Sequence, residues 1–185
     1  MASLREEISG PDPRDLDDEA LLTKAHGLYS QKDYADAVRY FEELLKRDLT
    51  PTKRGEVLRS LGFSCRMSAD HVKSEKVFRK LLAHHGEGTA DGMFALYHVA
   101  WSRFQQDDAA DARDIMDRVA STPHTADVWK IWARANAADF SIKLGDKARA
   151  RASLESLKAD LADDASPTGT RVKAYVEQML GRLES

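Results

Sequence analysis

Histidine and cysteine are the side chains of this chain that could hold a metal ion or take part in acid–base or nucleophilic chemistry. The sequence has six histidines and one cysteine. His84 and His85 are adjacent, so on a helix their side chains would point about 100° apart and would not share one metal ion. Both precede Gly86, and histidines in the last turn of a helix are stabilised by the helix dipole. We therefore interpret the pair as a helix end, and we expect no metal ion and no cofactor.

Cys65 is the candidate nucleophile. It lies at helical spacing from Leu61, and a free cysteine on an apolar stripe is usually buried. A reactive thiol needs a neighbouring positive charge or a histidine; Arg66 points to another face of the helix, whereas His71 could approach from the next one. The sequence shows no glycine-rich phosphate loop, serine-nucleophile turn or paired carboxylates. We expect no catalytic residue and no enzyme, although a ligand bound among His71, His84 and Cys65 would indicate one.

Composition narrows the class of protein further. The 185 residues are 42% apolar and 32% charged, with a net charge of −3, so no basic excess indicates binding to nucleic acid. No stretch approaches the roughly 18 apolar residues of a membrane span, and the acidic start does not resemble a signal peptide. A single cysteine excludes an intramolecular disulfide and fits a reducing compartment. We expect a cytoplasmic protein that does not insert into membranes.

The elements that position these residues follow from a pattern that occurs four times. In each copy an aspartate precedes a small residue by four positions, and a bulky apolar residue follows four positions later. Successive copies are 37, 38 and 38 residues apart, and a period of this length indicates stacked helix pairs. Each aspartate would cap the second helix of a pair. The copies are Asp33, Ala37 and Phe41; Asp70, Ser74 and Phe78; Asp108, Ala112 and Met116; and Asp146, Ala150 and Leu154.

Apolar residues at helical spacing set the expected boundaries. Residues 1–17 are acidic, contain two prolines and have no apolar face, which predicts a flexible N-terminal tail. A ninth amphipathic helix would cap the last pair, as the exposed end of an array requires. We expect no β-strand. The four predicted helix pairs occupy about 18–51, 52–86, 91–122 and 125–161, and the capping helix occupies 169–184.

The spacing of small residues resembles that of the tetratricopeptide repeat (TPR) family. Twelve residues before each small residue of the pattern lies another, where the family needs close contact between paired helices: Ala25, Gly62, Ala100 and Ala138. The similarity covers about 18–160 and is weakest in the fourth repeat, where Arg134 replaces an aromatic residue or leucine. The longer period leaves a related helical-repeat family open. The resemblance implies an all-α, right-handed superhelical array of about four antiparallel helix pairs.

The resemblance also implies a function and a site. In TPR proteins the first helix of each pair lines a concave surface that binds a partner protein. Aromatic and arginine side chains dominate binding hot spots, so we expect a non-catalytic scaffold that binds an apolar, aromatic-anchored peptide or helix. The positions that match the family's inward side chains are His26, Tyr29, Arg59, Phe63, Arg66, Tyr97, Trp101, Phe104, Trp132 and Asn136.

Two alternatives accompany this prediction. Some of the aromatic residues, notably Phe94 and Trp132, could pack between repeats instead of facing a partner, since an error of one position rotates a helical side chain by about 100°. An exposed aromatic surface could also drive self-association. In that case the groove would hold the tail 1–17 or the ninth helix of a neighbouring copy, and the chain would be a homo-oligomeric assembly module. The family's clamp for a terminal carboxylate is not expected, because its positions hold Leu22, His26, Ser60 and Tyr97.

Overall fold

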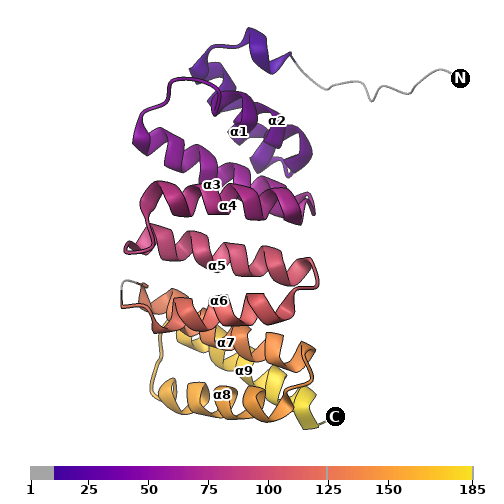
Figure 1. Ribbon diagram of the computed structural model, residues 1–185, viewed down its shortest axis with the longest axis vertical. Coiled ribbons are helices and arrows are strands. Elements are labelled where there is room, and N and C mark those ends of the chain that lie inside the picture. Colours follow the sequence, from indigo (N-terminus) through magenta and orange to yellow (C-terminus); the bar gives the residue numbers. More distant parts are fainter. Residues whose placement is uncertain (1–10, 124, 185) are drawn as a thin grey trace, which may run out of the picture. The chain divides into compact units, whose positions relative to one another are not determined.

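The computed structural model describes residues 11–123 and 125–184. Within these ranges the chain forms helices and no strand, which confirms the all-α prediction (Figure 1). A short 3-10 helix, η1 (Pro13–Asp15), precedes the α-helices. The α-helices are α1 (Asp18–Ser30), α2 (Tyr34–Leu44), α3 (Pro51–Met67), α4 (His71–His85), α5 (Ala90–Gln105), α6 (Ala109–Ser121), α7 (Asp127–Lys143), α8 (Lys147–Asp160) and α9 (Pro167–Glu184).

The contacts divide the chain into two compact units, with the boundary inside α4 between Val77 and Phe78. Unit 1 holds η1, α1 to α3 and the start of α4. Unit 2 holds the rest of α4 and α5 to α9. Each unit is described by itself below.

One turn geometry joins the two helices of every pair. The residue before each capping aspartate has a left-handed backbone, with φ of 66° at Lys32, 62° at Ala69, 63° at Asp107 and 78° at Gly145. The backbone N–H that follows donates to the carbonyl group five residues back, for example from Asp70 to Cys65 at 2.9 Å. This is the Schellman pattern, which ends a helix and satisfies its last carbonyl groups. The turn recurs at the repeat spacing, so it belongs to the repeat itself.

Capping by the four aspartates is confirmed for three of them. The carboxylates of Asp70, Asp108 and Asp146 accept backbone N–H groups at 3.0, 3.4 and 3.2 Å. Asp33 makes no such bond although its φ and ψ of −84° and 67° resemble those of Asp146. The expectation for Asp33 is therefore wrong, although its backbone conformation is the one that the capping aspartate Asp146 adopts.

The small residues of the pattern lie where two helices approach closely. Ala25 and Ala37 are fully buried in unit 1, as are Ala100 and Ala112 in unit 2. Ser74 is also fully buried, and its hydroxyl donates to the carbonyl oxygen of Gly62 at 3.1 Å. A larger side chain at these positions would force the paired helices apart. The structure thus gives the repeated small residues the packing role that the sequence predicted.

In unit 1 the segment before α1 packs on α2. The Tyr40 hydroxyl donates to the Pro11 carbonyl oxygen at 2.7 Å, and the Arg47 guanidinium donates to the Leu16 carbonyl oxygen at 3.3 Å. Pro13, in η1, is buried. The described part of the expected tail is therefore held by two side chains that bind its backbone, Tyr40 of α2 and Arg47, which follows α2. Residues 1–10 of that tail lie outside the described residues.

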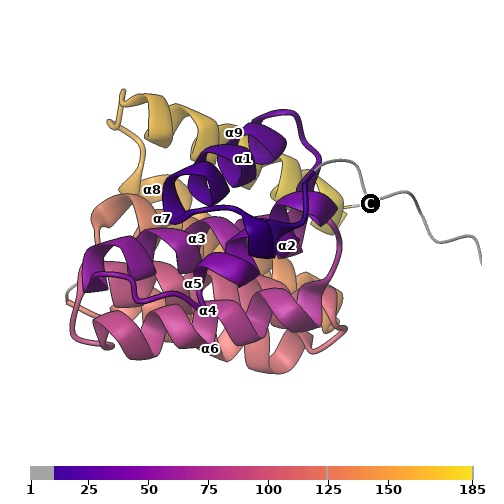
Figure 2. The same ribbon diagram turned by 90° about the horizontal axis from the view of Figure 1, so that it is seen from above.

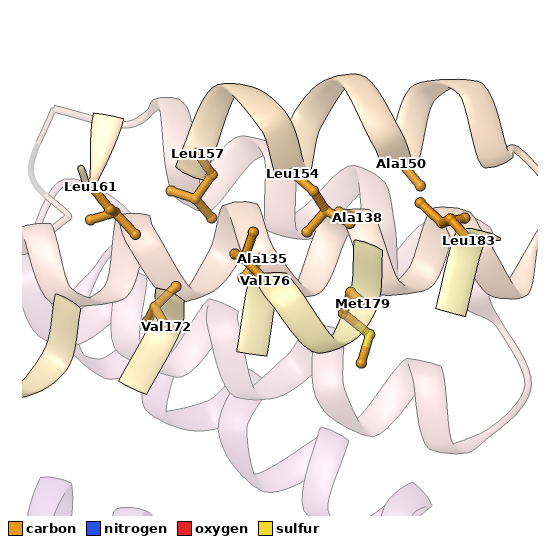
Figure 3. Packing of buried hydrophobic residues seen from close by; sticks show 10 residues of the cluster. All are labelled: Ala135, Ala138, Ala150, Leu154, Leu157, Leu161, Val172, Val176, Met179 and Leu183. Atoms are coloured by element: carbon orange, nitrogen blue, oxygen red, sulfur yellow. The ribbon is translucent and has the colours of Figure 1, made fainter. Parts of the chain in front are cut away.

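In unit 2 the last helix, α9, packs on the helix pair before it in the same way as α7 does. α7 contacts α6 and α5, and α9 contacts α8 and α7. Leu154 and Leu157 of α8 point toward α7 and α9, where Ala138 and Val176 meet them in one apolar cluster (Figure 3). The other face of α9 carries polar residues such as Arg171 and Gln178, which are exposed.

Candidate partner-binding surface

Five aromatic side chains of unit 2 are partly exposed, and one of them, Trp129, packs on the buried Tyr97 and Phe94. The other four come from three helices. Trp101 and Phe104 lie on α5, Trp132 on α7 and Tyr175 on α9. We call these four residues the aromatic surface. Amphipathic helices normally bury such side chains, so their partial exposure makes them the strongest candidates for contact with another molecule.

The α5 part of the aromatic surface rests on a buried ring. The Phe104 ring stacks on Phe140 with centroids 4.1 Å apart, and Trp101 meets Phe140 edge to face at 5.5 Å. Phe140 is fully buried, so it holds the two outer rings in fixed positions. Lys143 lies 5.1 Å from the Phe104 ring centroid and forms an ion pair of 2.7 Å with Asp107. This hydrogen-bonded ion pair lowers the pKa of the Asp107 carboxyl group, and it gives the rings a charged rim.

The α7 part of the aromatic surface is joined to α9. Trp132 packs edge to face against Tyr175, with centroids 5.9 Å apart. Two turns of helix from Tyr175, Arg182 forms an ion pair of 3.2 Å with Asp139. Burial and the nearby Asp139 carboxylate raise the pKa of Tyr175, so its hydroxyl stays protonated and serves as a hydrogen-bond donor. Tyr175 and Arg182 were missed from the sequence because α9 was interpreted only as a cap; applying the rule for inward positions to this helix as well would have identified Tyr175.

Tyr97 and Asn136, two further candidates, lie in the interior of unit 2. Their exposed fractions are 6% and 2%, and the Asn136 amide nitrogen donates to the Tyr97 hydroxyl at 2.7 Å. Tyr97 also packs against Trp129, which in turn packs against Phe94. The expectation that aromatic residues such as Phe94 pack between repeats is therefore met at this position. A role of Tyr97 and Asn136 in binding stays a prediction.

The candidates of unit 1 lie on α1 and α3. His26 is exposed and meets the buried Phe41 ring edge to face at 5.3 Å. Tyr29, half-buried, packs against Tyr34 at the same separation. On α3 the Arg66 guanidinium lies 5.4 Å from the Phe63 ring centroid, and Arg59 is partly exposed. Unit 1 thus offers aromatic and cationic groups, but fewer large aromatic rings than unit 2.

The side chains considered for catalysis lie on α3 and α4. Cys65 is fully buried, and burial raises the pKa of its thiol to about 12. His84 and His85 are partly exposed and contact each other edge to face at 4.9 Å. Gly86 follows with φ of +82°, as the interpretation of this region as a helix end requires. Within residues 11–123 and 125–184, histidine, cysteine and acidic side chains form no group of three or more that could hold a metal ion.

The antiparallel helix pairs, their buried small residues and their common turn define a TPR-like helical repeat. Residues 94–123 match the family model described as tetratricopeptide repeat. The crystal structure of TPR-like repeats from a Podospora anserina protein described as a kinesin light chain superposes with a TM-score of 0.66. The two sequences are 13% identical, and the match covers 94% of this chain and 90% of that chain. We found no curated protein whose sequence matches.

These findings confirm the prediction of a TPR or TPR-like helical repeat. Repeats of this kind generally mediate protein–protein interaction and typically serve as non-catalytic scaffolds. None of the helices in the described ranges combines the length and the apolar character that crossing a membrane requires.

Proposed function

We propose that the chain is a non-catalytic scaffold and that the aromatic surface of unit 2 binds an apolar, aromatic-anchored peptide or helix of another protein. The observation that carries this proposal is the partial exposure of Trp101, Phe104, Trp132 and Tyr175 on helices of a protein-binding fold. Tryptophan and tyrosine are enriched among the residues that dominate binding energy. Tyr29, Phe63 and the other candidates of unit 1 remain a separate prediction for the helices of that unit.

The packing beneath these rings supports the proposal on energetic grounds. Phe140 holds Trp101 and Phe104, and Tyr175 holds Trp132, before any partner arrives. Ordering a flexible side chain at an interface costs about 0.5–1.5 kcal/mol, and pre-organised rings avoid most of that cost. The rim formed by Lys143, Asp107 and Arg182 gives polar partners for the edge of such an interface.

The test compares the proteins that co-purify with the wild-type chain and with Trp101→Ala and Trp132→Ala. Val72→Ala is the matched control, because Val72 is apolar and 52% exposed on α4, outside the aromatic surface. We expect both tryptophan variants to lose the partner while circular dichroism shows an intact fold, and the control to retain it. Recovery of the same partner with all variants would refute the assignment of the site.

We also propose that the chain works in the cytoplasm. Its one cysteine is a free, buried thiol, which a reducing compartment preserves. Fractionation of the cells that express the chain tests this proposal, and recovery in an oxidising compartment would overturn it.

A further inference from the structure

One face of α1 is uncovered in the described part of unit 1. A groove of about 500 Å³ runs along this face from Asp17 to Gln31, over Ala20, Thr23 and Gly27. Thr23 is exposed, and a Cβ atom placed on Gly27 would meet no atom within 4 Å. Figure 2 shows α1 and the segment before it, which runs over α2.

The repeat register shows what this face does elsewhere. The positions that correspond to Ala20 and Gly27 in the later repeats are all buried. Two of the helices that carry them pack on the preceding helix, α3 on α2 and α7 on α6. We infer that this face of α1 corresponds to a face that other helices cover in the later repeats. The buried counterparts are Val57 and Ser64, Ala95 and Ser102, and Ala133 and Phe140.

We propose that α1 of a second copy of this chain packs antiparallel on this face, so that the protein forms a two-fold symmetric dimer. The charges of α1 favour that occupant and that direction. Asp17 and Glu19 lie at the amino-terminal end of the groove, whereas Lys32 follows the carboxyl-terminal end of α1. A parallel partner would place acids beside acids. An antiparallel partner places the acidic end of each helix beside Lys32 of the other copy and opposes the two helix dipoles favourably.

The symmetry axis would lie between Thr23 and Lys24, which brings Ala20 of one copy opposite Gly27 of the other. Both positions are small, so the helices can approach to about 8 Å. Glu19 and Lys24 of the second copy would then lie about 6 Å apart along the helix axis, within reach of two long side chains. Neither residue forms an ion pair inside the described chain. The positions equivalent to Lys24 in the later repeats hold buried apolar residues, Leu61, Val99 and Ala137. A lysine at this position of the first repeat fits a charged contact between copies.

The test measures the mass in solution against protein concentration by analytical ultracentrifugation. The single chain has a mass of 20.7 kDa, and we expect a concentration-dependent rise toward twice that value that weakens at high salt. Gly27→Trp should weaken association at least tenfold. Gly181→Trp is the matched control, because Gly181 is an exposed helical glycine of α9 whose Cβ position is equally open.

Charge reversal tests the proposed direction of packing. Glu19→Lys alone and Lys24→Glu alone should each weaken association, and the double variant should restore it, because the two ion pairs across the axis re-form with opposite sign. Thr23→Cys should form a disulfide-linked dimer faster than Thr170→Cys, an exposed site on α9, since Cys65 is buried and does not compete.

Three results would overturn the dimer: a wild-type chain that stays single at millimolar concentration, a Gly27→Trp variant that associates like the wild type, or no restoration in the double charge variant. The proposal is independent of partner binding by unit 2. A chain that dimerises normally with Trp101→Ala and loses only its partner would separate the two surfaces.

Discussion

The Asn136 side chain of α7 donates a hydrogen bond of 2.7 Å to the Tyr97 hydroxyl of α5, and both groups are buried. The two residues are 39 positions apart in the sequence. This bond joins the first helices of two successive repeats inside unit 2. The contribution of this hydrogen bond to the free energy of unfolding can be measured by replacing each of the two side chains singly and then both together.

Tyr97→Phe removes the hydroxyl and leaves the Asn136 amide buried, so we expect unfolding to become easier by about 1–3 kcal/mol. Asn136→Leu should cost a similar amount for the same reason. The double variant should lose less stability than the two single variants lose together, since neither of the two polar groups then remains buried. A double-mutant cycle in urea checks this coupling; strictly additive losses would show that the bond contributes nothing to stability.

The four turns between paired helices lead to a second prediction. Ala69 holds φ of 62°, whereas the equivalent residue of the fourth repeat is Gly145 with φ of 78°. A left-handed conformation costs a residue with a side chain about 1–2 kcal/mol. Ala69→Gly should therefore stabilise unit 1 by about 1 kcal/mol, and Gly145→Ala should destabilise unit 2 by a similar amount. Thermal unfolding of both variants provides the measurement, and shifts of the same sign would contradict the argument.

These turns also show which part of the fold the sequence did not predict. Helices were predictable because apolar residues recur at helical spacing, and the repeated small residues gave the register of the pairs. The left-handed residues of the first three turns were not, because Lys32, Ala69 and Asp107 carry no glycine signal. The hydrogen bonds of the turn itself, such as the one from Asp70 to Cys65, accompany that conformation in each case.

The candidate site shows a related limit. Helical spacing gives the direction of a side chain such as Tyr97, but whether a neighbouring helix covers it depends on the next repeat. Trp101 retains partial exposure, whereas Tyr97, one turn earlier, is buried. Only the packing of α7 against α5 decides between them.

Two helical glycines give a third prediction, because both lie in α-helices but the space around their Cβ positions differs. A Cβ atom on Gly27 would meet open space, whereas one on Gly92 would lie 1.9 Å from the Gly86 carbonyl oxygen. Gly27→Ala should stabilise the chain by about 1 kcal/mol through helix propensity. Gly92→Ala should destabilise it by about 1–3 kcal/mol, because the start of α5 must move. Urea unfolding at a low protein concentration tests both; equal effects would mean that the contact with Gly86 is relieved without cost.

The buried thiol gives the last prediction. Burial raises the pKa of Cys65 to about 12 from an ordinary value of 9.0, so between these values the unfolded chain has lost a proton that the folded chain retains. Stability must then fall as the pH rises from about 9 to 12. Cys65→Ala lacks this titration, and its stability should fall less over the same interval. In the native protein at pH 8 we expect iodoacetamide to leave Cys65 unmodified, and in urea we expect complete alkylation. Rapid alkylation of the native protein would show that the thiol is accessible, and the pH argument would fail with it.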